Sequence, residues 1–183
     1  TTQGERPTRA PHTGREPGVS GTAVVTGAGG GLGREIAVRL ARKGYAVRAT
    51  DVDADLADAA AADINATGPA YPVLGEVLDV RDQDACRALA RSIPDLALWV
   101  NNAGVLATGP VWSHTDDERR LMLEVNTFGT VHGTIAALEV MRPAGRGHVI
   151  NIASLAGLVP VPGEGVYAGS KHAVVGFSTS ALA

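Results

Sequence analysis

Short apolar runs alternate along the chain with stretches in which apolar residues recur every three or four positions. The runs are rich in β-branched residues, which is typical of strands that are buried on both faces. They predict strands at Thr22–Thr26, Tyr45–Thr50, a stretch that ends with Val77–Val80, Leu96–Asn101 and His148–Ala153.

The periodic stretches between these runs predict helices. Leu32, Ile36 and Leu40 lie four residues apart, and Lys43-Gly44 supplies a basic last turn and a glycine cap. Further helices are predicted over Asp53–Ile64, Asp82–Ser92 and Asp116–Met141, and from about Gly165 onward. Strands that alternate with helices pair in parallel through right-handed crossovers. The predicted fold is therefore α/β, a doubly wound parallel sheet that is Rossmann-like, with three α-β-α layers.

Residues 1–20 lack any apolar period, so we expect a flexible N-terminal arm there and one folded domain over residues 21–183. The arm has no apolar core of a secretory signal. Its arginines suggest a targeting peptide as an alternative, but Glu5 and Glu16 argue against that reading.

Composition narrows the function classes. The chain has 183 residues, with 16 basic and 19 acidic side chains and a net charge of −3, which disfavours a nucleic-acid groove. No apolar run reaches the roughly 18 residues that span a bilayer. The single cysteine, Cys86, cannot form an intrachain disulfide, so nothing points to secretion and we expect a cytoplasmic protein.

A glycine-rich turn, TGAGGGLG at Thr26–Gly33, lies between the first strand and the first helix. Its spacing is T-G-x3-G-x-G, with Gly27, Gly31 and Gly33 in register and Leu32 between the last two. Glycine permits the sharp turn, and the N–H groups of the helix N-terminus suit a pyrophosphate. A purely structural turn is the alternative.

Asp51 ends the second strand, where a carboxylate can accept hydrogen bonds from the adenosine ribose and repel a 2′-phosphate. Val52 and Gly30 stand where an NADP site would need a basic residue, and Arg48 lies inside the strand. NAD is therefore favoured over NADP.

Tyr167 and Lys171 share one face of the last predicted helix. An ammonium group lowers the pKa of a nearby phenol, so the pair can act as a general acid and base. Ser154, 13 residues earlier at the end of a strand, can bind a substrate oxygen or simply cap a turn. A surface pair on an ordinary helix is the alternative for Tyr167 and Lys171.

Three further positions are candidates for site residues. Asn126 lies inside the predicted helix Asp116–Met141, where asparagine is unfavourable. One interpretation is a local distortion that frees a backbone group to hold water near Lys171, and the alternative is a tolerated polar position on an exposed face. In the NNAG segment after the fourth strand, small residues let the backbone of Asn101, Ala103 and Gly104 come close to a cofactor ribose, while the asparagine side chains can tie neighbouring strands. Asp79 can accept a hydrogen bond from the adenine amino group, with Val80 beside it.

Together these motifs resemble the short-chain dehydrogenase/reductase family, in its single-domain branch, over roughly residues 21–183. The resemblance implies a catalytic tetrad of Asn126, Ser154, Tyr167 and Lys171. Tyr167 would exchange the proton, and Lys171 would support it and hold the nicotinamide ribose. Ser154 would orient the substrate oxygen, and Asn126 would position a relay water. The implied activity is hydride transfer between NAD(H) and a secondary alcohol or ketone.

The resemblance also sets expectations about the whole molecule. The family's domain usually continues beyond the tyrosine helix, so we expect this sequence to be part of a longer protein, incomplete at the C-terminus. Apolar residues near the site favour an apolar ketone or secondary alcohol as substrate. A homotetramer is expected first and a dimer second.

Two alternatives to this oxidoreductase stay open. One is a non-catalytic dinucleotide-binding or sensing module, and the other is an epimerase or dehydratase that uses the same hydride chemistry internally. The five histidines show no ligand spacing, so no metal site is predicted.

Overall fold

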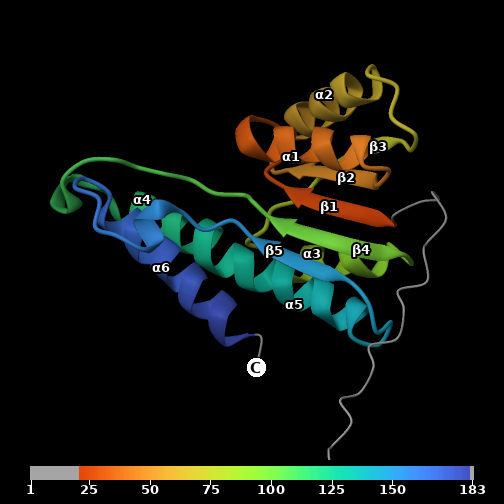
Figure 1. Ribbon diagram of the computed structural model, residues 1–183. Helices are drawn as coiled ribbons and strands as arrows, with labels where there is room; N and C mark the ends of the chain where they lie inside the picture. Colours follow the sequence, from red (N-terminus) through yellow and green to blue (C-terminus); the bar gives the residue numbers. More distant parts are fainter. Residues whose placement is uncertain (1–20, 182–183) are drawn as a thin grey trace, which may run out of the picture.

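The computed structural model describes residues 21–181, which build a five-stranded parallel sheet with helices on both faces (Figure 1). The strand order is β3-β2-β1-β4-β5, so the chain crosses from one half of the sheet to the other between β3 and β4. The strands are β1 (Thr22–Thr26), β2 (Ala46–Asp51), β3 (Val73–Val77), β4 (Leu96–Asn101) and β5 (His148–Asn151).

The helices connect these strands. They are α1 (Gly31–Arg42), α2 (Ala54–Asn65), α3 (Gln83–Arg91), α4 (Asp116–Leu123), α5 (Gly129–Met141) and α6 (Gly165–Ser180). Short 3-10 turns cover Val111–Ser113 and Leu155–Gly157. Asp53 and Asp82 cap α2 and α3 by accepting hydrogen bonds from backbone N–H groups of the first turn.

Alternate residues of the central strands pack against opposite helical layers. Val25 of β1 belongs to the core beneath α1 and α2, whereas Val24 belongs to the core shared with α3 and α5. Trp99 of β4 is fully buried in the second core. The predicted α/β doubly wound sheet with three layers is confirmed.

The predicted elements agree with the structure except at particular ends. The predicted arm, residues 1–20, lies outside the described residues. No helix within residues 21–181 is both long and apolar enough to cross a membrane.

The third strand was predicted to run through Val80, and this boundary is wrong. β3 ends at Val77, and Leu78 adds one more hydrogen bond by donating to the Asp51 carbonyl. Asp79 then turns the chain, because its carboxylate accepts the Arg81 backbone N–H at 2.9 Å. This local competition for the backbone ends the strand.

The predicted helix over Asp116–Met141 is divided into two. A π-helical segment, Glu124–Phe128, separates α4 from α5, and Asn126 lies at its centre. The expected distortion at Asn126 is thereby confirmed. Such segments are rare and are frequent at functional sites.

A buried polar network joins β4 to α5 and β5. The Trp99 indole donates to Asn101 Oδ1 at 2.7 Å, and Asn101 Nδ2 donates to Thr134 Oγ1 at 3.0 Å and to Asn151 Oδ1 at 2.8 Å. Gly133 faces this network, and a Cβ there would lie 2.6 Å from Trp99 Nε1 and would overlap Asn101 Oδ1. The network therefore requires glycine at position 133.

We expect Gly133→Ala to lower the free energy of unfolding by about 1–3 kcal/mol, because the added methyl group overpacks this network. Gly176→Ala is the matched control, since a Cβ at Gly176 meets nothing within 4 Å, and it should stabilise α6 by about 0.5–1 kcal/mol. Urea unfolding of both variants measures the difference. Equal stability of the two variants would contradict the packing argument.

Candidate functional site

A hollow of about 560 Å³ opens where the carboxyl ends of four strands meet. Its walls come from the glycine turn after β1, the end of β2, Leu78–Arg81 after β3 and Asn102–Val105 after β4. Leu121 and Val125 close one side. A doubly wound sheet binds its ligand at this place, next to the point where the strand order reverses.

The glycine turn brings α1 against the end of β1. Gly27 and Gly31 have φ values of +63° and +52°, a region that disfavours side chains. A Cβ at Gly33 would overlap the Gly27 carbonyl oxygen. The first turn of α1 can therefore present its N–H groups to a phosphate at close range.

Asn102 holds this turn in place, and sequence reasoning did not include it among the site residues. Its Nδ2 donates to the Thr26 carbonyl at 2.9 Å and to the Gly27 carbonyl at 3.1 Å. The signal available was the pair of asparagines at the end of β4, of which only Asn101 was selected.

Asn101 instead belongs to the buried network with Trp99. Its side chain is 3% exposed and does not line the hollow. Gly31 also lies outside the lining, although its neighbours Gly30 and Leu32 belong to it.

Asp51 braces the glycine turn from the end of β2. Its Oδ2 accepts the Gly29 N–H at 3.0 Å, and its Oδ1 accepts the Asp53 N–H at 3.2 Å. The carboxylate lies in the lining of the hollow, as expected for a group that meets a ribose. Arg48, which sequence reasoning placed away from the site, forms an ion pair with Glu76 on β3.

Asp79, Val80 and Arg81 form the wall after β3. The Asp79 carboxylate is bound on both oxygens by the Arg81 guanidinium, with Nε 3.0 Å from Oδ1 and Nη2 2.6 Å from Oδ2. Hydrogen bonds from the Arg81 side chain hold the pKa of Asp79 below its usual value. Val80 is buried and its carbonyl faces His132 Nδ1 at 3.0 Å.

Beyond Gly104 lies a second group of polar side chains. A Cβ at Gly104 would stand 3.3 Å from Asn126 Oδ1 and 3.6 Å from Lys171 Nζ, so glycine leaves this junction open. Asn126 is fully buried, and its side chain binds both backbone groups of Val105, at 2.8 Å and 2.9 Å. Asn126 Nδ2 also donates to Ser170 Oγ at 3.0 Å, which ties the π-helical segment to α6.

Lys171 is the buried cation of this group. It is 4% exposed, its Nζ donates to the Ile152 carbonyl at 2.9 Å, and it lies 5.8 Å from the centre of the Tyr167 ring. Burial lowers the pKa of the Lys171 ammonium from its ordinary value near 10.5. No carboxylate forms an ion pair with it within the described part of the chain.

Ser154 and the backbone of Asn126 complete the candidate tetrad. Ser154 follows β5 and accepts the Ala156 N–H at 3.2 Å, so its hydroxyl caps the turn at Leu155–Gly157. The Asn126 carbonyl, expected to hold water, accepts the Thr130 hydroxyl at 2.8 Å. The structure thus places Lys171 near the Tyr167 ring and ties Asn126 to α6 through Ser170. Ser154 lies after β5, the strand next to β4.

Two other groups lie outside this chemistry. Burial raises the pKa of the Cys86 thiol to about 12, so it is no nucleophile. Among residues 21–181, no cluster of three His, Cys, Asp or Glu side chains is arranged to hold a metal ion.

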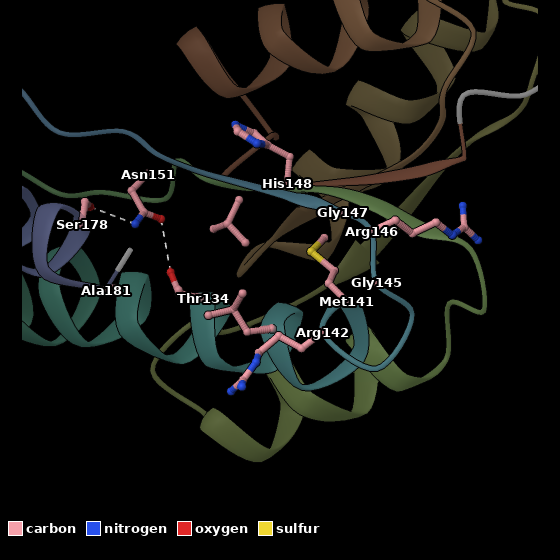
Figure 2. A pocket seen from close by; sticks show the side chains of 12 residues that line it. Thr134, Met141, Arg142, Gly145, Arg146, Gly147, His148, Asn151, Ser178 and Ala181 are labelled. Atoms are coloured by element: carbon pink, nitrogen blue, oxygen red, sulfur yellow. Dashed lines mark hydrogen bonds between the residues drawn. The ribbon is translucent and has the colours of Figure 1, made fainter. Parts of the chain in front are cut away.

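A separate hollow of about 470 Å³ lies between α5, β5 and the last turn of α6. Figure 2 shows Asn151 in its wall, hydrogen-bonded to Ser178 on one side and Thr134 on the other. None of the predicted catalytic or cofactor residues lines it.

Known proteins resemble the chain in sequence and in structure. A family model described as short chain dehydrogenase matches residues 21–183, and the chain belongs to this family. Putative oxidoreductase SadH of Mycobacterium tuberculosis is 35% identical over 160 residues, which cover 85% of this chain and 57% of that protein. Levodione reductase of Leifsonia aquatica is 34% identical over 85% of this chain and 60% of its own length.

Solved structures agree with this assignment. A short-chain dehydrogenase/reductase from Burkholderia phymatum in complex with NAD has a TM-score of 0.84 and 32% identity, covering 91% of this chain and 60% of that one. A crystal structure of levodione reductase has a TM-score of 0.83 and 33% identity. The chain spans 57–60% of the length of the curated relatives named here.

The buried state of Lys171 predicts a pH dependence of stability. Because its pKa is lowered in the folded protein, the unfolded chain binds more protons between that lowered pKa and about 10.5. As the pH rises through this window, the free energy of unfolding of the unaltered protein should therefore rise relative to that of Lys171→Met. This variant keeps the apolar stem of the side chain and removes its charge.

Lys43→Met, at an exposed lysine of the same chain, is the matched control. Urea unfolding at several pH values between 7 and 10.5 measures both differences. The same pH dependence in the two variants would contradict the burial argument.

Proposed function

We propose that the protein is an NAD(H)-dependent oxidoreductase that transfers a hydride between the nicotinamide and a secondary alcohol or ketone. The observation that carries this proposal is the buried Lys171 ammonium, 5.8 Å from the Tyr167 ring and next to Asn126 and Gly104. Burying a cation that has no carboxylate partner raises the free energy of the folded protein. Strongly perturbed ionisable groups of this kind cluster at functional sites.

The hollow fits a dinucleotide in three ways. The glycine turn would hold the pyrophosphate. The missing Cβ atoms at Gly27 and Gly33 let the turn pack against Ala103 and α1, and at Gly30 and Gly31 a Cβ would meet only open space, so a phosphate can approach the backbone there. The Asp51 carboxylate would accept hydrogen bonds from the ribose hydroxyls. The backbone of Asn102–Gly104 would lie beside the sugar, between the glycine turn and Lys171. When bound, the nicotinamide supplies the hydride chemistry.

The protein residues then act on the substrate oxygen and its proton. Tyr167 would act as general acid and base, giving its phenolic proton to a ketone oxygen or taking one from an alcohol. Lys171 would stabilise the phenolate that forms and would bind the nicotinamide ribose. Ser154 would donate to the substrate oxygen, and Asn126 would hold a relay water through the distorted segment.

The names of the relatives support the oxidoreductase class, and the similar Burkholderia phymatum structure is a complex with NAD. Exposed apolar residues follow Ser154 in the sequence, and they favour an apolar substrate: Leu155, Leu158 and Val159. A homotetramer, or a dimer as the second choice, and a cytoplasmic location stay predictions.

Asp51 gives a test of cofactor choice. We expect Asp51→Asn to narrow the preference for NADH over NADPH by about tenfold, because the charge that repels a 2′-phosphate is removed. Asp117→Asn removes the same charge from the exposed first turn of α4 and is the control. Kd values from nucleotide fluorescence titrations measure the change. An unchanged ratio in Asp51→Asn would refute this role of Asp51.

Tyr167→Phe separates the enzyme from a dinucleotide-binding module. We expect the variant to lose at least about 100-fold of turnover, the low end of what general acid–base catalysis supplies, while its Kd for NAD stays within about twofold. Spectrophotometry with NAD over a panel of secondary alcohols measures turnover in the full-length protein.

Tyr45→Phe is the matched control, because Tyr45 lies just before β2 and does not line the hollow. If NAD binds but no alcohol in the panel gives turnover that depends on Tyr167, the binding-module alternative is favoured instead.

A further inference from the structure

Arg81 lies in the wall of the hollow that follows β3. Pyrophosphate at the glycine turn and ribose at Asp51 leave the base to lie against the residues after β3. There the side wall is apolar, with Leu78, Val80 and Val125. The polar groups at this end are Asp79 and Arg81.

These two side chains form one bidentate unit. Arg81 Nε lies 3.0 Å from both Asp79 oxygens, and Nη2 lies 2.6 Å from Oδ2. The Arg81 backbone N–H adds a further bond to Oδ1 at 2.9 Å. Hydrogen bonds to a guanidinium are among the stronger ones in proteins, so Asp79 is already well supplied with donors before any base arrives.

Arg81 keeps donors that Asp79 does not use. Its Nη1 is 3.9 Å from Glu124 Oε2, longer than a hydrogen bond, and its side chain is 43% exposed. Guanidinium has five N–H donors and no acceptor, whereas an ionised carboxylate only accepts. The end of the hollow therefore presents donors and acceptors side by side.

We propose that Arg81 determines which purine the site accepts, by allowing a base with a 6-oxo group to bind about as well as adenine. This inference rests on the dinucleotide-binding function proposed above. The 6-amino group of adenine is a donor and would be met by Asp79. The 6-oxo group of hypoxanthine is an acceptor and would be met by the N–H groups of Arg81.

The probes are NADH and the reduced nicotinamide hypoxanthine dinucleotide, which differ only at the purine. Their Kd values for the full-length protein, from nucleotide fluorescence titration, should agree within about threefold, because the 6-amino group and the 6-oxo group each find a partner. A preference of about tenfold or more for adenine in the unaltered protein would overturn the proposal.

Two variants should shift this ratio in opposite directions. Arg81→Met removes the donors and keeps a long apolar stem, so adenine should be preferred by about tenfold, the effect of one unpaired hydrogen-bonding group. Asp79→Ala removes the acceptor and should favour hypoxanthine by a similar factor. Arg87→Gln changes an arginine that pairs with Glu139 outside the hollow and should leave the ratio unchanged.

The outcomes separate the two proposals. Binding of both dinucleotides with no shift in either variant overturns the role of Arg81 and leaves the proposed function standing. Absence of binding of either dinucleotide to the unaltered protein overturns the proposed function and this inference together. Circular dichroism confirms that each variant is folded, and the reciprocal variant decides the matter if one fails to fold.

Discussion

Helix α1 starts so close to the end of β1 that no side chain fits between them. Gly33 stands against the Gly27 carbonyl, and the Asn102 side chain holds that same carbonyl from β4. This contact links the two halves of the sheet at the point where the strand order reverses. It sets the position of the first N–H groups of α1 and the direction of the loop after β4. Because that loop includes Gly104, the contact also sets how far the glycine turn lies from Lys171. The hollow exists because these three backbones are held together.

Much of the fold follows from the local pattern of apolar residues. The apolar runs of β1 and β4 indicate buried strands, and the periodicity of the main helices indicates helices. The errors occur where a side chain competes with the backbone. Nothing in the apolar pattern shows that the Asp79 carboxylate binds the Arg81 N–H and ends β3 at Val77. The division of the helix at Asn126 was predictable because asparagine and glycine are both unfavourable inside a helix.

The site was predictable in its residue types more than in its contacts. Asn101, the last residue of β4, and Asn102, the next residue, have side chains on opposite sides of the chain, so Asn101 enters the core network and Asn102 reaches the glycine turn. Sequence alone does not show which of the two faces the ligand without the register of β4. The pairing of Arg81 with Asp79 was equally invisible, because an arginine two residues after a carboxylate usually points to solvent.

The order of the strands has a consequence for the way the chain folds. β1 pairs with β2, which follows it after one helix, but its other neighbour, β4, contributes Val100, which is 74 residues away from Thr26. The strands β1, β2 and β3 therefore pair with partners that are close in the sequence, whereas the pairing of β4 with β1 closes a long loop. Closing a long loop slows folding. The glycine turn follows β1 and Asn102 follows β4, so the two lie on either side of this long closure. A ligand that touches both would therefore stabilise the pairing of β1 with β4 once it had formed.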